Sequence, residues 1–146
     1  MKRDPHRLID YLKHILEAIQ RIEEYVADLD EATFLQNKLV QDAVIRNFEV
    51  IGEASHNIEK RFPEFVADHP ELPLATAYQM RNAIAHGYFE VDFEILWKTI
   101  HINLPGLHSK ISGIKEKLLI SFGKSSVAST ATSHLGEITR SSSDAS

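Results

Sequence analysis

The sequence predicts an all-α protein, an up-and-down bundle of about five helices with a flexible C-terminal tail. Apolar residues recur at alternating steps of three and four, and no run alternates strongly with period two. The 146 residues are 43% hydrophobic, which suffices for a core without disulfides, and the chain contains no cysteine. We therefore predict one helical domain over residues 1–120 and a tail over residues 121–146.

Two long helices are expected first. Asp4 and Pro5 form an N-cap followed by a proline at the first helical position. The stripe of the first helix then consists of Leu8, Leu12, Ile15, Ile19, Ile22 and Val26. A second helix is predicted from about Glu31 to Arg61, with an inner face of Leu39, Ala43, Phe48 or Val50, Ile51, Ala54 and Ile58.

Three shorter helices and the tail complete the prediction. After a loop containing Pro63, Pro70 and Pro73, a third helix is expected from Leu74 to about Ala85. Asp92 should cap a fourth helix with apolar positions Phe93, Leu96, Trp97, Ile100 and Leu104, and Pro105-Gly106 should end it. The last helix contains Leu107, Ile111, Ile114 and Leu118. In residues 121–146, 12 of 26 residues are Ser or Thr, a composition that cannot offset the entropy of ordering.

Charge and motif content exclude several functional classes. The formal charge of -5 argues against a broad cationic surface for nucleic acid, although a small basic site remains compatible with it. The charged N-terminal run and the lack of a long apolar stretch predict a cytoplasmic protein without a membrane span. The chain has no glycine-rich phosphate loop, no HExxH and no GxSxG. Its histidines are scattered, so we expect no metal site and no cofactor.

One segment combines side chains suited to phosphodiester chemistry. Arg81 and His86 stand five residues apart, and Tyr88 follows directly after Gly87. Arginine can stabilise charge on phosphorus and histidine can move the proton of a 2′-hydroxyl, without a metal. Five residues correspond to about 140° around an ideal helix, so the pair converges only if the helix ends between them or two copies face each other. The alternative is a capped helix end with a surface arginine.

Arg46 and Glu53 are a second polar pair, seven residues apart and therefore on one helix face. Two functional interpretations are a buried polar pair that supports the site and a contact with a partner. The alternative is an exposed pair, with Asp42 and Arg46 forming an i,i+4 salt bridge.

Several segments together resemble the HepT family, the HEPN-domain toxins of prokaryotic HepT–MntA toxin–antitoxin modules. The resemblance covers most of residues 5–118. It is carried by residues 42–54 (DAVIRNFEVIGEA), by Met80-Arg81-Asn82 through His86-Gly87-Tyr88 with Val91-Asp92, by Leu96-Trp97, and by residues 104–107 (LPGL). Leu72-Pro73-Leu74 departs from the family, which often has a proline followed by a tryptophan there.

The resemblance implies a HEPN-like fold and a metal-independent endoribonuclease toxin that acts on RNA, not DNA, as a homodimer. Arg81 and His86 would be the catalytic pair, with Asn82 orienting a phosphate or the imidazole. Tyr88 matches the tyrosine to which an MntA-like nucleotidyltransferase antitoxin transfers AMP. In the first functional interpretation of the helix spacing given above, Arg46 and Glu53 would support this site. The alternative function is a non-catalytic helical subunit of a nucleotidyltransferase, which the acidic composition would suit.

Overall fold

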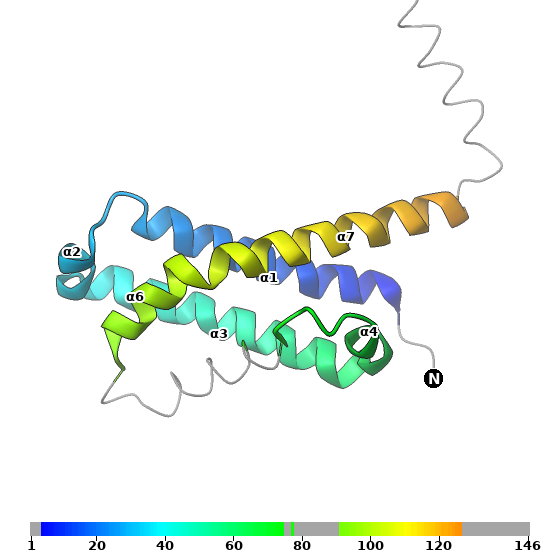
Figure 1. The fold of residues 1–146 in the computed structure, drawn as a ribbon, viewed down its shortest axis with the longest axis horizontal. Helices are drawn as coiled ribbons and strands as arrows, with labels where there is room; N and C mark the ends of the chain where they lie inside the picture. The colour runs from blue at the N-terminus through cyan, green and yellow to red at the C-terminus, as the bar shows by residue number, and fades with distance from the viewer. Residues whose placement is uncertain (1–3, 75–76, 78–90, 127–146) are drawn as a thin grey trace, which may run out of the picture. The chain divides into compact units, whose positions relative to one another are not determined.

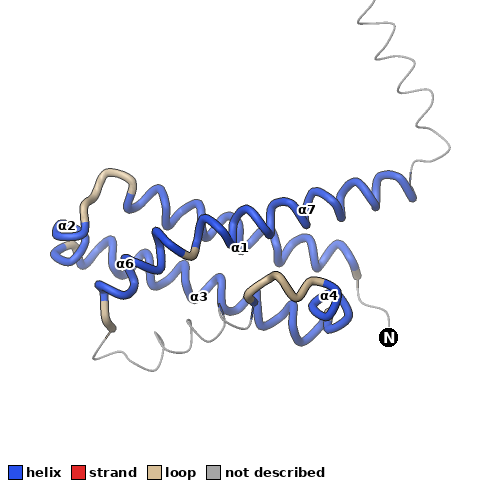
Figure 2. The backbone as a smooth tube through the Cα atoms, viewed as in Figure 1, coloured by secondary structure: helices blue, strands red, loops and turns tan. Residues whose placement is uncertain are grey.

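A computed structural model describes residues 4–74, 77 and 91–126 of the chain. These residues form helices and loops only, as Figure 2 shows, which confirms the all-α prediction. Six helices lie in the described part, against about five expected in the whole chain. The described residues up to Gly113 make one compact unit, and the described residues from Ile114 onward make another. No helix in the described ranges has the length and apolar character needed to cross a bilayer.

Helix α1 (Pro5–Val26) begins where the sequence predicts. The Asp4 side chain accepts a hydrogen bond from the backbone N–H of His6 at 3.0 Å, which satisfies one of the unpaired donors of the first turn. All six residues of the predicted stripe are buried. Burial of each such side chain stabilises the fold by roughly 1.5–3 kcal/mol, so the stripe is the main reason that this helix packs into the core.

The predicted second helix is interrupted, because Asn37 separates α2 (Glu31–Gln36) from α3 (Lys38–Arg61). The Asn37 backbone is extended, and its side chain accepts a hydrogen bond from Val40 N at 3.0 Å. Asn37 therefore ends one helix and caps the next. Asp30 caps α2 in the same way, and the hydrogen bond from Thr33 N lowers the pKa of its carboxyl group.

The inner face of α3 differs from the prediction at its beginning. Leu39 is 81% exposed, whereas Gln41 is buried and donates from Nε2 to the Phe34 carbonyl at 2.9 Å. A glutamine whose amide is hydrogen-bonded can occupy the core. The buried face of α3 therefore begins at Gln41, a polar residue that a search for apolar periodicity does not detect. Between the two alternatives at the centre, Phe48 is buried and Val50 half-buried. Ile51, Ala54 and Ile58 are buried as predicted.

Helices α1 and α3 pack against each other in antiparallel directions, as Figure 1 shows, and form the main helix pair among the described residues up to Gly113. A short helix, α4 (Pro63–Asp68), follows α3 where the sequence predicts only loop. Pro63 occupies its first position, where the missing N–H costs no hydrogen bond. The predicted third helix lies outside the described residues except for Leu74 and Ala77, both of which are buried.

Helix α6 (Phe93–Ile102) begins at the predicted cap, since Asp92 accepts hydrogen bonds from Glu94 N and Ile95 N at 3.0 and 3.1 Å. The predicted break at Pro105-Gly106 is wrong. Asn103 separates α6 from α7 (Leu104–Ser126), and Pro105 lies in the first turn of α7, where proline is tolerated. Residues 127–146, most of the predicted tail, lie outside the described residues.

Candidate functional site

The predicted catalytic residues Arg81 and His86, with Asn82 and Tyr88, all lie outside the described residues. The chain on either side of them is well anchored. Leu72 and Leu74 are buried before this segment, and Asp92 caps α6 after it. Among the predicted site residues, the described part of the chain therefore contains Arg46 and Glu53.

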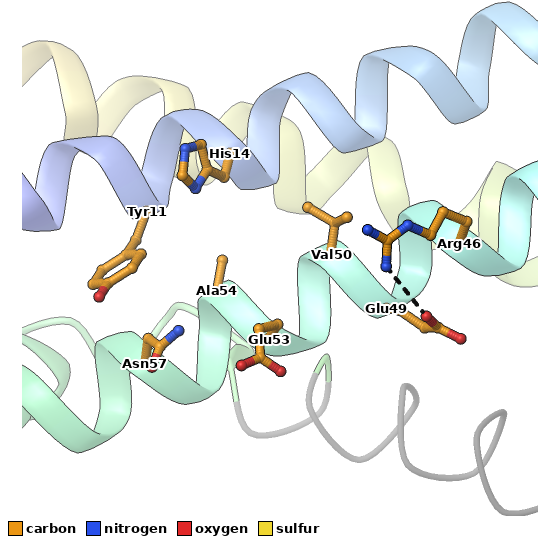
Figure 3. A pocket seen from close by; sticks show the side chains of 8 residues that line it. All are labelled: Tyr11, His14, Arg46, Glu49, Val50, Glu53, Ala54 and Asn57. Carbon is orange, nitrogen blue, oxygen red and sulfur yellow. Dashed lines mark ion pairs between the residues drawn. The ribbon is translucent and has the colours of Figure 1, made fainter.

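Arg46 and Glu53 line one pocket between α1 and α3, which we call the α1–α3 pocket (Figure 3). Its volume is about 280 Å³. This is near the lower end of the roughly 300–1,000 Å³ that small-molecule sites occupy. The lining residues are Tyr11 and His14 from α1 and Arg46, Glu49, Val50, Glu53, Ala54 and Asn57 from α3. The prediction that Arg46 and Glu53 share a helix face is confirmed by this arrangement.

Arg46 forms the charged end of the pocket together with Glu49. Nη1 of Arg46 lies 3.5 Å from Oε2 of Glu49, and the two side chains are 74% and 40% exposed. The interpretation of Arg46 and Glu53 as a buried polar pair is wrong, because both residues are exposed. The predicted salt bridge is also wrong in its partner, since Arg46 pairs with Glu49, three residues on, and not with Asp42.

Tyr11 and Asn57 line the opposite end of the pocket, and the side chains of Val50 and Ala54 lie between the two ends (Figure 3). The Tyr11 ring is half-buried and makes edge-to-face contacts with His14 and Phe62, each at a centroid distance of 6.5 Å. Such contacts fix the orientation of an aromatic ring. The pocket thus combines an ordered ring and an apolar floor with carboxylate, amide and guanidinium groups.

Sequence reasoning identified neither Tyr11 nor His14 nor Asn57 as a site residue. The spacing along the sequence could have identified Asn57. Residues 46, 50, 53 and 57 follow steps of four, three and four, which places them on one face of α3. No comparable signal exists for Tyr11 and His14. They line the pocket only because α1 packs against α3, and this packing is a tertiary feature.

A second hollow of about 250 Å³ lies near the C-terminal ends of α1 and α6. His101 lines it together with Glu23, Val26, Ala27, Leu29, Ile100 and Pro105. The imidazole of His101 is in contact with the Trp97 ring at a centroid distance of 4.2 Å, and its Nδ1 is 2.8 Å from the Trp97 carbonyl oxygen. His101 therefore packs on Trp97 of its own helix and is exposed.

Comparisons with known proteins identify relatives over most of the chain. The family model described as "Ribonuclease HepT-like" matches residues 15–114. A "Probable ribonuclease HepT" from Thermococcus cleftensis is 42% identical over 107 residues, which are 73% of this chain and 94% of that protein. A "Putative RNase" from Caldanaerobacter subterraneus subsp. tengcongensis is 33% identical over 107 residues, 73% of this chain and 93% of that protein.

A longer relative contains the matching region as one part. The "Gamma-glutamylcyclotransferase and putative RNase" of Methanocaldococcus jannaschii is 40% identical over 108 residues, 74% of this chain and 47% of that protein. No solved structure shows a significant match to the chain. The matched residues 15–114 include the α3 residues that line the α1–α3 pocket, whereas Tyr11 and His14 precede the match. They also include Arg81 and His86.

Proposed function

Since this chain belongs to the HepT-like ribonuclease family, we propose that it is a metal-independent endoribonuclease and the toxin of a toxin–antitoxin module. The observation that carries the proposal is the family match over residues 15–114, which spans the Arg81–His86 motif. RNA is the substrate, DNA is not, and the protein acts in the cytoplasm without a cofactor. A homodimer supplies two copies of the motif to one cleft.

The proposed reaction uses the 2′-hydroxyl of the RNA as the nucleophile. This oxygen loses its proton and attacks the adjacent phosphorus, and the bond from phosphorus to the 5′-oxygen breaks. His86 moves the proton off the nucleophile or onto the leaving oxygen, and Arg81 stabilises the negative charge that grows on the phosphoryl oxygens. Asn82 orients the phosphate or the imidazole. The products are a 2′,3′-cyclic phosphate and a 5′-hydroxyl.

DNA lacks the 2′-hydroxyl, so this reaction is confined to RNA. The fixed charge of Arg81 makes a bound cation unnecessary for neutralising the phosphate. The net charge of the chain, -5, repels RNA at long range. Charges farther away than about 10 Å are screened at 0.1 M salt, however, so a local cluster of arginines in the cleft can still bind phosphate.

Arg46 supports this reaction by binding RNA at the charged end of the α1–α3 pocket. Its side chain is 74% exposed and belongs to a salt bridge of the exposed kind, which contributes only about 0–1 kcal/mol. A phosphate of the RNA backbone can therefore replace or join Glu49 at the guanidinium at little cost. Glu53 lines the same pocket and lies on the same face of α3 as Arg46, so both residues support the site.

The activity is controlled by AMP transfer to Tyr88 from an MntA-like nucleotidyltransferase antitoxin. The phenol oxygen of Tyr88 attacks the α-phosphorus of ATP and pyrophosphate leaves. The adduct adds bulk and a negative phosphate two residues from His86. A phosphate at this point pairs with Arg81 and repels the RNA backbone, which switches the toxin off.

A cleavage assay with defined products tests the proposed reaction. Purified protein is incubated with a single-stranded RNA in EDTA, and the product ends are identified by mass spectrometry. The expected result is cleavage with 2′,3′-cyclic phosphate ends and no requirement for a divalent cation. Cleavage that depends on a divalent cation contradicts the mechanism. Absence of cleavage, with retained binding to the nucleotidyltransferase, favours the alternative of a non-catalytic subunit, which the acidic composition also suits.

A further inference from the structure

The α1–α3 pocket has the wrong charge for a phosphate along most of its length. Its guanidinium is paired with Glu49, and Glu53 adds a second carboxylate, so carboxylates outnumber the guanidinium in the lining. A carboxylate repels phosphate but accepts hydrogen bonds from N–H groups. Beyond the Arg46 end, the pocket is therefore suited to a neutral group that carries donors.

We propose that the α1–α3 pocket binds a guanine base of the single-stranded RNA substrate. The proposal rests on the ribonuclease function proposed above. Single-stranded RNA is recognised through unstacked bases, which stack on aromatic rings and present their edges to polar side chains. The pocket supplies both kinds of contact, since Tyr11 and His14 provide rings and Glu53 and Asn57 provide polar groups.

The apolar part of the pocket fits the flat face of a base. Val50 and Ala54 form the floor between the two polar ends (Figure 3). The half-buried Tyr11 ring is held by its edge-to-face contacts with His14 and Phe62. Stacking on such a ring does not distinguish one base from another, because every base has an aromatic face. Discrimination must come from the polar side chains.

The carboxylate of Glu53 selects guanine among the four bases. Guanine alone presents two adjacent N–H donors on its Watson–Crick edge, N1–H and the N2 amino group, which match the two oxygens of one carboxylate. Because a carboxylate has about four acceptor positions, Glu53 can bind the base and keep contacts within the protein. Asn57 lies four residues further on the same face, and its amide can donate to O6 of the base.

Arg46 then lies at the end of the pocket where the backbone phosphate of the bound nucleotide is expected. The guanidinium is exposed at the pocket's end, and Asn57 and Tyr11 are at the opposite end (Figure 3). A nucleotide with its base towards Glu53 and Asn57 therefore directs its phosphate towards the one cation of the pocket lining. The base and the phosphate of the nucleotide therefore bind at opposite ends of the pocket, the base at the polar end with Asn57 and the phosphate at the end with Arg46.

Titration of the protein with the four 5′-mononucleotides, followed by NMR, tests the proposal without any cleavage. The expected result is that GMP binds more tightly than AMP, CMP and UMP by roughly fivefold or more, the scale of a bidentate base contact. Glu53→Gln should remove this preference, whereas Glu64→Gln, at an exposed site on α4, should leave it unchanged. If Glu53→Gln does not fold, as judged by circular dichroism, Asn57→Ala should weaken the preference instead.

The proposal is overturned if the four nucleotides bind equally, if none binds, or if another base is preferred. It is also overturned if the preference for GMP survives both Glu53→Gln and Asn57→Ala. The outcome is separate from that of the ribonuclease assay. If GMP binds selectively but no RNA is cut, the proposed function fails and the guanine site stands. If RNA is cut and GMP is not preferred, only the guanine site fails.

Discussion

Nη1 of Arg46 lies 3.5 Å from Oε2 of Glu49, one turn along α3, and the pair forms the charged end of the α1–α3 pocket. The three-residue spacing places both side chains on one side of the helix, towards solvent. An exposed ion pair of this kind contributes little to folding. Because the pair lies at one end of a pocket, we expect it to matter more for ligand binding than for the stability of the fold.

We therefore expect Arg46→Gln to affect RNA binding and not folding. The free energy of unfolding should change by about 0.5 kcal/mol or less. In a His86→Ala background that prevents cleavage, the slope of log K for RNA binding against log salt concentration should decrease by about 0.7, the value for one phosphate contact to a single strand. Arg21→Gln, at an exposed arginine of α1, is the matched control. Equal changes in the two variants would exclude a specific contact at Arg46.

Phe34→Ala should be severely destabilising. Phe34 is fully buried, and its ring contacts those of Trp97 and Phe93 at centroid distances of 5.2 and 6.3 Å. Urea denaturation should show a loss of about 3–5 kcal/mol in the free energy of unfolding, because the truncation leaves a cavity. Leu39→Ala, at a residue that is 81% exposed, should change it by only about 0.5 kcal/mol. Similar losses in both variants would contradict the described packing of α2.

The protein should be a homodimer in solution. Two copies of the Arg81–His86 motif are needed in one cleft if each helix continues through the motif, because five residues separate the side chains by about 140°. Light scattering at micromolar concentration should give twice the chain mass of 16.6 kDa. A mass of one chain at this concentration would rule out a site shared between two copies.

Tyr88→Phe should separate the catalytic activity from its control. The variant keeps the aromatic ring but lacks the oxygen that accepts AMP, so it should cut RNA and resist inactivation by the nucleotidyltransferase with ATP. Intact-mass analysis should show the adenylate on the wild type and on Tyr25→Phe, a control at an exposed tyrosine of α1, and none on Tyr88→Phe. An adduct on Tyr88→Phe that silences it would place the modified residue elsewhere.

Apolar periodicity and N-capping residues predicted correctly those helices whose boundaries and buried faces depend on local sequence alone. The stripe of α1 and the Asp4 and Asp92 caps are confirmed, because periodicity and capping act within one helix. Two of the errors arise where a polar side chain forms a specific hydrogen bond. Asn37 divides the predicted second helix by capping, and Gln41 enters the core because the Phe34 carbonyl satisfies its amide.

The candidate site was predictable only in part for a related reason. Arg46 and Glu53 are related by helix spacing, which can be read along α3. Tyr11 and Asn57 come from different helices, and only the packing of α1 on α3 brings them to one pocket. Arg81, His86 and Tyr88 were singled out by their chemistry and spacing, and the family resemblance added Asn82. The roles of these residues stay a prediction.

The rate of RNA cleavage by His86→Ala, compared with the wild type in EDTA, tests the proposed ribonuclease mechanism most directly. His101→Gln is the control, since His101 is exposed and packs on Trp97 of its own helix. If His86 is the general acid or base, the rate should fall by about 10²–10⁴-fold in His86→Ala and remain near that of the wild type in His101→Gln. Cleavage by His86→Ala at the rate of His101→Gln would contradict the assignment of His86 and the mechanism built on it.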